Sequence, residues 1–399
     1  MSNLRVRSAV SPLRRRVLDA EGAFVPAVLP TVDGLVAEMR PEEPVHCIRP
    51  AVLAATAAEF VAAFPGDTLY AVKCNPDPAV LRALWEGGVR HFDCASPAEI
   101  GLVRQMFPAA EIHFMHPVKA RGAIREAWAR HGVRDFVLDS AAELAKILAE
   151  VAATGVAGSL GLVVRLALPK GAAVLDLSGK FGAEAEEAIA LLRAARPHVA
   201  RLGVAFHVGS QCLEPLAWRA ALGIAGSVIA AAGVAIDVVD VGGGFPVAYP
   251  DVKVPALGAF MAEIEAGSEA LGLPGARLWA EPGRALVAGG GSVVVQVQAR
   301  RGDALYINDG VYGSLADAGG LGFRFPVRCL RADAAANARA FRLFGPTCDS
   351  ADVMQGPFWL PEDIGEGDWI EIGQLGAYGA CLRTGFNGFD RARIVEVSA

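Results

Sequence analysis

The chain has 399 residues, and 53% of them are hydrophobic, which is enough for two or three domains with a large buried core. The 37 Lys and Arg are outnumbered by 43 Asp and Glu, and the resulting net charge of −6 argues against nucleic acid as a partner. The seven cysteines are odd in number and form no CxxC pair, which predicts a reducing, cytoplasmic location without a disulfide framework.

The N-terminal segment, residues 1–45, shows no clear helical period. Its arginines are not followed by an apolar stretch, so the segment does not have the pattern of a secretory signal. We expect residues 1–45 to contribute strands to a β domain formed mainly by the other end of the chain.

From about residue 65 to 285, short apolar runs alternate with stretches of helical character. A doubly wound open sheet and a (β/α)8 barrel both show this alternation, and the number of strands distinguishes them. Eight runs within roughly 220 residues favour an α/β fold of the closed-barrel type, to which we assign residues 46–285. The runs are 68–73, 91–96, 112–117, 135–140, 161–168, 203–210, 238–245 and 277–284. The main helix candidates are 76–87, 97–106, 141–152, 184–196, 214–232 and 256–271.

One uncharged stretch, residues 220–236, resembles a membrane span in its lack of charge. It is rich in alanine and is interrupted by three glycines, whereas a spanning helix needs about 20 strongly apolar residues. We therefore predict a packed helix that leads into a strand, and no membrane partner.

The pattern changes after residue 285. Segments such as 292–301 and 338–344 are strand-like, and long helical patterns are missing. We predict an all-β, barrel-like domain over residues 286–399. If residues 1–45 join this domain, the (β/α)8 barrel is inserted within it.

Unusual residues stand at the ends of the predicted barrel strands, where barrel enzymes carry their chemistry. Lys73 ends the first run, and a solvent-facing lysine is the ordinary interpretation. The chain has only six lysines but many arginines, and an amine is irreplaceable where it must lose its proton and bond covalently to a carbonyl. Lys73 is therefore a candidate for covalent catalysis.

Three consecutive glycines, Gly242 to Gly244, follow the seventh run. A tight turn explains them as well as a phosphate cradle does, and they match neither the dinucleotide pattern nor the P-loop. Glu281 and Arg284 end the eighth run. The ordinary interpretation is that these two neighbours form an ion pair with each other. Barrels often bind phosphate after strands seven and eight, so one phosphate at these glycines and Arg284 is the functional interpretation.

Two further residues have an ordinary and a functional interpretation. His207 is either a satisfied core histidine or a ring that stacks on a flat ligand. Cys348 lies in GPTCDS and is either inert or a reactive thiol in a turn. The sequence contains no HExxH or GxSxG motif, so we predict neither a metal site nor a serine triad. A covalent lysine, a single-phosphate cradle and an acid for a ring nitrogen together indicate pyridoxal 5'-phosphate (PLP).

The ordered segments of the chain resemble those of fold type III PLP-dependent decarboxylases, in particular the ornithine decarboxylase branch. The segments are YAVKCNP, FDCAS, FHVGSQC, DVGGGFP, AEPGR, NDGVYGS, GPTCDS and GAYG followed by FNGF, and the likeness runs from about residue 45 to the C-terminus.

The resemblance implies a role for each matching residue. Lys73 would carry PLP covalently, Glu281 would keep the ring nitrogen protonated, and His207 would stack on the ring. Asp93 would support Lys73. The phosphate would be bound by Ser210, Gly243, Gly244, Arg284 and Tyr378.

The resemblance also implies a substrate site and a homodimer. Cys348 would protonate the substrate carbon, Asp349 would bind the distal cation, and Tyr312 and Phe386 would line the pocket. In this family the residues that match Cys348 and Asp349 come from the partner subunit of each active site. Lys180 and Asp352 match a family ion pair across that interface.

The substrate pattern departs from the family in one place. Ornithine enzymes carry a second acid after VYGS, whereas residues 315–325 hold only Asp317, out of register. L-ornithine, decarboxylated to putrescine for polyamine synthesis, is the expected substrate. The alternatives are lysine, a diaminopimelate-like acid and a carboxylated polyamine. A racemase is disfavoured because Glu281 replaces the arginine typical of that class, and a non-catalytic regulatory homologue is disfavoured because Lys73 and the phosphate ligands are present.

Overall fold

The computed structural model describes residues 17–18, 24–25, 29–169 and 179–399. These residues form two compact units. The barrel unit comprises residues 54–76 and 84–288, and the β unit comprises residues 1–53, 77–83 and 289–399.

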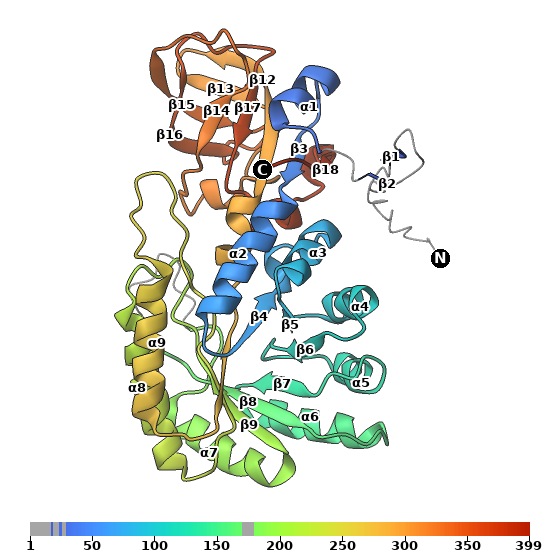
Figure 1. Ribbon diagram of the computed structural model, residues 1–399, viewed down its shortest axis with the longest axis vertical. Helices are drawn as coiled ribbons and strands as arrows, with labels where there is room; N and C mark the ends of the chain where they lie inside the picture. Colours follow the sequence, from blue (N-terminus) through green and yellow to red (C-terminus); the bar gives the residue numbers. More distant parts are fainter. Residues whose placement is uncertain (1–16, 19–23, 26–28, 170–178) are drawn as a thin grey trace. The chain divides into compact units, whose positions relative to one another are not determined.

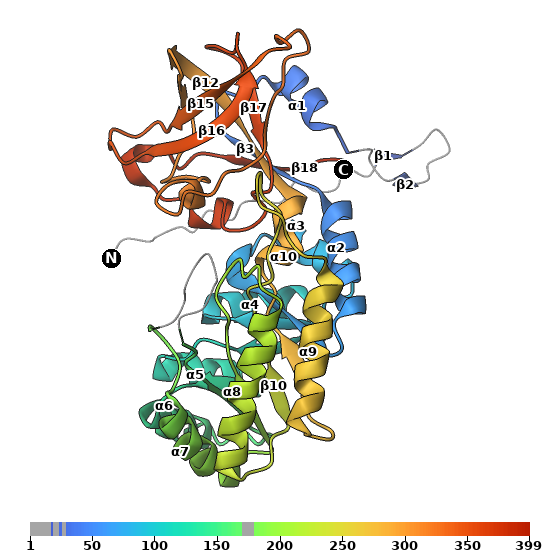
Figure 2. The same ribbon diagram turned by 90° about the vertical axis from the view of Figure 1, so that its left-hand side faces the viewer.

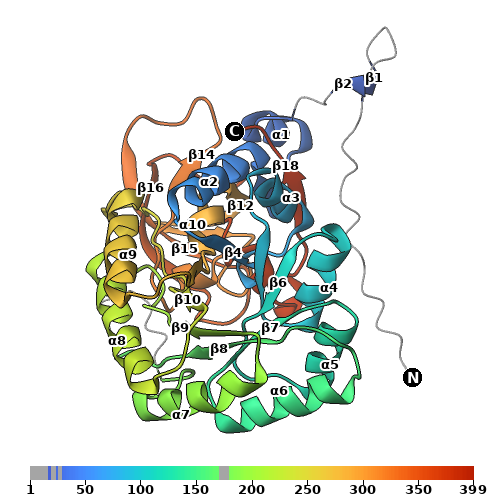
Figure 3. The same ribbon diagram turned by 60° about the horizontal axis from the view of Figure 1, so that its bottom comes forward.

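The barrel unit contains a closed barrel of eight parallel strands, which confirms the predicted (β/α)8 barrel (Figure 1). Viewed from its end, helices α4 to α9 ring the strands (Figure 3). The strands are β4 (Asp67–Ala71), β5 (His91–Cys94), β6 (Glu111–Phe114), β7 (Asp135–Leu138), β8 (Gly161–Arg165), β9 (Arg201–Ala205), β10 (Val238–Asp240) and β11 (Arg277–Ala280). The helices are α2 (Pro50–Ala63), α3 (Pro78–Glu86), α4 (Pro97–Met106), α5 (Arg121–Ala129), α6 (Ala141–Ala153), α7 (Ala185–Ala195), α8 (Leu216–Ala232), α9 (Leu257–Leu271) and α10 (Arg284–Val287), of which α2 and α3 begin in the β unit.

Local sequence signals explain where the barrel helices begin and end. Ser96 and Ser140 accept a hydrogen bond from the backbone N–H three residues later, which caps α4 and α6. Gly233 and Gly272 end α8 and α9 in the left-handed conformation, at φ of 65° and 60°. Among the described residues, no helix combines the length and the apolar character that a membrane span requires.

Apolar side chains fill the middle of the barrel, so the interior is a packed core rather than a pore. They come from strands around the whole barrel or the residues that follow them, and they are Leu69, Met115, Val137, Val163, Ala205, Val238 and Trp279. The polar groups of the site therefore gather beyond this layer, at the carboxyl ends of the strands.

The β unit is built on the long strand β12 (Gly291–Arg301), which pairs with β3, β13 and β17 (Figure 2). Its other strands are β3 (Val45–Ile48), β13 (Ala304–Ile307), β14 (Val327–Cys329), β15 (Ala338–Phe344), β16 (Val353–Pro361), β17 (Trp369–Ile372) and β18 (Arg393–Glu396). The strands β1 (Val17–Leu18) and β2 (Phe24–Val25) pair antiparallel in a separate two-stranded sheet. The second domain is thus mainly sheet, as predicted.

A short helix, α1 (Val32–Met39), lies in the segment where the sequence showed no helical period. Thr31 caps it by accepting a hydrogen bond from Gly34 N at 3.1 Å. Val32, Leu35 and Val36 pack against Val45 and other core residues of the β unit. The periodicity is real but covers only two turns, which is too short to stand out from the surrounding sequence.

Candidate active site

Lys73 lies just beyond the end of β4, in a single 3₁₀ turn formed by Val72–Cys74. Its Nζ is 3.0 Å from Oδ2 of Asp93 on the neighbouring strand β5. The carboxylate is 1% exposed whereas the lysine side chain is 49% exposed. A buried acid therefore holds the amine of a lysine whose side chain is half-exposed.

The glycine turn, Gly242 to Gly244, packs against two other strand ends. A Cβ on Gly243 would lie 2.6 Å from the Glu281 carbonyl oxygen and 3.1 Å from His207 Nε2. Gly244 has φ of 102°, and a Cβ there would lie 2.4 Å from the Gly209 carbonyl oxygen. Only glycine fits this turn, and its bare backbone can approach a ligand closely.

His207 follows β9 and presents an uncharged ring. Its Nδ1 accepts a hydrogen bond from Gly209 N at 2.9 Å, which leaves the proton on Nε2. Burial lowers the pKa of His207 to about 3, and the cations Arg165 and Lys73 add to this effect. The residue is therefore neutral at physiological pH and suited to stacking on a flat ring.

Glu281 stands at the end of β11, and its backbone N–H donates to the Gly242 carbonyl at 2.9 Å. Burial raises the pKa of its carboxyl well above the usual range. The carboxyls of Asp240 and Asp93 raise that pKa further, while Lys73 and Arg165 lower it. Glu281 can thus hold a proton where an ordinary glutamate would be ionised.

Arg284, the first residue of α10, is 5% exposed and donates from Nη1 to the Tyr249 hydroxyl at 2.9 Å. Gln211, next to Ser210, joins the loop after β9 to the loop after the glycine turn. Its side-chain amide makes hydrogen bonds of 3.0 and 2.8 Å to the carbonyl and N–H of Val247. The predicted phosphate ligands of the barrel unit therefore lie on loops that are fixed to one another.

The predicted substrate residues of the β unit form one cluster. Tyr312 donates a short hydrogen bond to Asp349, and its ring lies 4.8 Å from the ring of Phe386. Cys348 Sγ is 3.2 Å from Oδ1 of Asn387, which also accepts from the Cys348 backbone N–H at 3.1 Å. An aromatic pair, a carboxylate and an exposed thiol thus meet on one surface.

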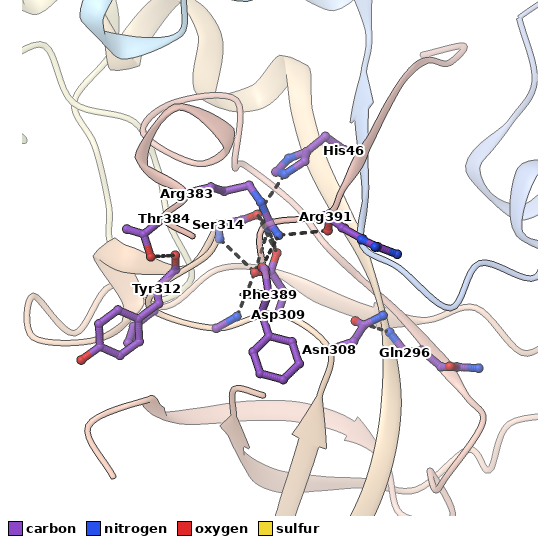
Figure 4. Close-up of polar contacts among 12 residues, drawn as sticks. His46, Gln296, Asn308, Asp309, Tyr312, Ser314, Arg383, Thr384, Phe389 and Arg391 are labelled. Carbon is purple, nitrogen blue, oxygen red and sulfur yellow. Dashed lines mark hydrogen bonds and ion pairs between the residues drawn. The ribbon is translucent and has the colours of Figure 1, made fainter. Parts of the chain in front are cut away.

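A buried ion pair supports the turn that carries Tyr312 (Figure 4). Arg383 Nη1 lies 3.0 and 2.9 Å from the two carboxylate oxygens of Asp309. Asp309 also accepts from the Ser314 backbone N–H and hydroxyl at 3.0 and 2.6 Å. The backbone of Thr384 then donates to the Tyr312 carbonyl at 2.9 Å, so both ends of the turn are held.

Three predicted residues lie outside these clusters. Lys180 Nζ is 5.1 Å from the centre of the Phe181 ring in the barrel unit. Asp352 is 3% exposed in the β unit, where it accepts hydrogen bonds from Val311 N, Thr347 N and Thr347 Oγ1. Tyr378, also in the β unit, has a left-handed backbone with φ of 54°. Asp317 is buried in its own unit, at 7% exposed.

The residues of the barrel unit fit PLP. The turn that only glycine can form, together with Arg284, suits a phosphate, because backbone N–H groups and a guanidinium bind its oxygens. The neutral ring of His207 suits a flat heterocycle, and Glu281 suits a ring nitrogen that carries a proton. Lys73 supplies the amine that the aldehyde requires.

Sequence analysis missed several residues at the site. Asp240 accepts from Gly242 N at 2.8 Å, and its position at the end of an otherwise apolar strand was an available signal. Tyr249, Gln211 and Asn387 act through tertiary hydrogen bonds that no sequence spacing reveals. Arg165 ends β8 and was concealed within an apolar run.

The chain matches known proteins over most of its length. Residues 51–288 match the family described as pyridoxal-dependent decarboxylase, pyridoxal binding domain. A lysine/ornithine decarboxylase of Selenomonas ruminantium is 34% identical over 332 residues, which cover 80% of each chain.

Two solved structures are similar in fold as well as in sequence. The arginine decarboxylase of Paramecium bursaria Chlorella virus has a TM-score of 0.80 at 26% identity, over 92% of this chain and 99% of that chain. A lysine/ornithine decarboxylase of Vibrio vulnificus, solved with putrescine, has a TM-score of 0.78 at 30% identity, over 96% and 99%.

Proposed function

The chain belongs to the pyridoxal-dependent decarboxylases, with PLP as cofactor, and from this premise we propose that it converts L-ornithine to putrescine and CO2. The relatives named for ornithine, lysine and arginine support a basic amino acid as substrate. The observation that carries the proposal is Glu281, a proton-holding carboxyl beside neutral His207 and the glycine turn, where a racemase would place an arginine. The resulting polyamine product would be made in the cytoplasm.

The cofactor, when bound, supplies a ring that withdraws electrons from the substrate carbon that loses CO2. In the proposed mechanism Lys73 would hold the cofactor through its amine, and Asp93 orients Lys73 through the 3.0 Å contact. His207 would pack on the ring, and Glu281 would keep a proton at the ring nitrogen. The glycine turn, Ser210, Arg284 and Tyr378 would bind the phosphate.

The β unit would complete the site. Cys348 would donate its thiol proton to the substrate carbon after CO2 leaves, and Asp349 would bind the distal ammonium. We propose that these two residues act in the site of a second copy of the chain, so that the enzyme is a homodimer with two shared sites. Lys180 would pair with Asp352 of the partner subunit, where the carboxylate already accepts three hydrogen bonds that shape the loop carrying Cys348.

The substrate proposal is tested by release of CO2 from single amino acids. Purified enzyme with PLP is incubated separately with L-ornithine, L-lysine, L-arginine, a diaminopimelate and carboxynorspermidine, and kcat/KM is measured for each. We expect ornithine to have the highest value and putrescine to be its product. A higher value for another member of the panel makes the ornithine assignment wrong, and loss of optical rotation without CO2 makes the enzyme a racemase.

Tyr312→Phe is expected to weaken substrate binding while leaving chemistry nearly intact. The Ala351 backbone N–H and the Tyr312 hydroxyl lower the pKa of Asp349 and hold its carboxylate in one orientation. Without this hydrogen bond the exposed carboxylate is less well oriented, and we expect a roughly five-fold rise in KM. Steady-state kinetics with ornithine measure the change.

The matched control for Tyr312→Phe is Tyr306→Phe. Tyr306 lies in the same unit and stacks on Phe344, at 5.1 Å between ring centres. Its variant should keep the KM of the parent enzyme. If Tyr312→Phe also keeps that KM, Asp349 does not depend on Tyr312 for its substrate contact.

A further inference from the structure

Asp240 is a carboxyl that the proposed mechanism leaves without a role. It ends β10 and is fully buried, and its Oδ1 accepts from Gly242 N at 2.8 Å. Its other oxygen, Oδ2, is buried, and among the described residues no N–H or hydroxyl donates to it. The Asp240 side chain interacts with the Glu281 carboxyl, and Gly242 links the two residues, since its N–H donates to Asp240 and its carbonyl accepts from Glu281 N at 2.9 Å. Two carboxyls form a hydrogen bond only when one of them carries a proton.

Five neighbouring segments of the barrel unit place titratable or charged groups around this carboxyl pair. Asp93 on β5 raises the pKa of both carboxyls, and His113 on β6 lowers that of Asp240. The cations near Glu281 are Lys73, after β4, and Arg165 on β8, while neutral His207 follows β9. Lys73 is already in contact with Asp93 at 3.0 Å. The pair therefore lies in a region where ionisation of both members is unfavourable.

The protonation of the pair follows from burial and like charge together. Burial raises the pKa of Asp240 to about 6, despite the hydrogen bond from Gly242 N. The pKa of Glu281 is raised well above its usual range, first by burial and then by Asp240. Two carboxyls that face each other with little solvent share one proton at neutral pH, as coupled sites do.

We propose that Asp240 is a positioning residue that shares one proton with Glu281 in the cofactor-free enzyme and drives that proton onto the ring nitrogen when PLP binds. In this step the Glu281 O–H bond breaks and a ring N–H bond forms. One negative charge on the pair becomes two carboxylates beside one ring cation, so the net charge is unchanged. The inference rests on the proposed role of Glu281 at the ring nitrogen.

The geometry also gives Asp240 a second connection. Asp240 Oδ1 accepts a hydrogen bond from Gly242 N, so Asp240 also fixes the turn that is proposed to bind the phosphate. The two ends of the cofactor would therefore be positioned by one buried side chain. Asp240→Asn is the informative variant, since it keeps the Oδ1 acceptor while it removes the charge and replaces Oδ2 by an amide donor.

Proton uptake during PLP binding tests the proposal directly. The cofactor-free enzyme is titrated with PLP in a calorimeter at about pH 7.5, in buffers with different heats of ionisation. Asp240→Asn removes one of the charges that raise the pKa of Glu281, so Glu281 is ionised to a greater extent before PLP binds and the ring nitrogen takes more of its proton from solvent. We expect uptake to rise by up to about one proton per site relative to the parent enzyme. Equal uptake in both proteins overturns the proposal.

The stability of the cofactor-free enzyme provides a readout without PLP. The pKa of Glu281 is higher in the folded chain than in the unfolded chain, so its contribution is complete at low pH and is lost as pH rises through the folded value. This contribution to the parent Tm should therefore decrease as pH rises above the range in which an ordinary glutamate ionises. Asp240→Asn and Glu281→Gln should each flatten this fall, and the double variant should flatten it no further.

Asp135→Asn is the matched control for stability. Asp135 is also buried in the barrel, but a hydrogen bond from His113 and the charge of Arg201 lower its pKa against the effect of burial. Its variant loses a carboxylate that is paired with Arg201, so its Tm should drop across the whole range. If Asp240→Asn behaves like Asp135→Asn, the proposal is wrong. Should Asp240→Asn not fold, Glu281→Gln decides whether the slope arises from the pair.

The two levels of inference fail in different ways. An enzyme that binds no PLP contradicts the proposed function itself. An enzyme that binds PLP and releases CO2, but whose Asp240→Asn variant has the parent's proton uptake and Tm slope, contradicts only the role of Asp240.

Discussion

Lys73→Ala is expected to lower the rate of decarboxylation about 1,000-fold. The variant should also lack the absorbance band at about 420 nm that the parent enzyme shows and that borohydride bleaches. The reason is that this amine is the group that can bond to the cofactor aldehyde, and Asp93 holds it in place at 3.0 Å. The proposed phosphate ligands at the glycine turn are unchanged, so the variant should still retain PLP weakly. Spectra before and after borohydride, with CO2 release, measure both effects.

Lys253→Ala is the control for Lys73→Ala. Lys253 is an exposed lysine of the same unit and lies in a loop after the glycine turn. Its variant should keep the parent spectrum and turnover. A Lys73→Ala protein that retained the bleachable band and normal turnover would falsify the covalent role and, with it, the proposed mechanism.

The barrel was predictable because its signals are local and repeated. Each strand is a short apolar run bounded by helix caps, and runs such as 135–140 contain the observed strand β7 almost unchanged. Lys73 shows the limit of this method. The sequence placed it at a strand end, whereas the strand ends at Ala71 and Lys73 lies in the 3₁₀ turn that follows, a departure of two residues that the apolar pattern does not reveal.

Residues that act through tertiary contacts were not predictable in this way. Asp240 is the last residue of strand β10, and the sequence does not show that Glu281, about 40 residues later, interacts with it. Asn387 has a left-handed φ of 53° and holds the Cys348 backbone and thiol, although nearly 40 residues separate the two in sequence. A motif identifies residues that bond to the ligand, but it does not identify the residues that orient those side chains.

Cys348→Ala is expected to reduce turnover about 100-fold, within the range for loss of a general acid. The thiol is one of two exposed cysteines, and its Sγ lies 3.2 Å from Asn387 Oδ1. The other exposed cysteine, Cys381, is in the same unit, and Cys381→Ala should leave turnover unchanged. A Cys348→Ala enzyme with normal turnover would mean that another group delivers the proton.

Co-expression of Cys348→Ala with Lys73→Ala then tests whether sites are shared between subunits. If each site combines the barrel unit of one subunit with the β unit of the other, a mixed dimer has one site with both residues intact. Half of the dimers are mixed at random, so about a quarter of the parent activity should return. Lys73→Ala with Glu281→Gln is the control, because both residues lie in the barrel unit and no combination restores a complete barrel. Failure of the first pair to recover activity would place Cys348 and Lys73 of one subunit in the same site.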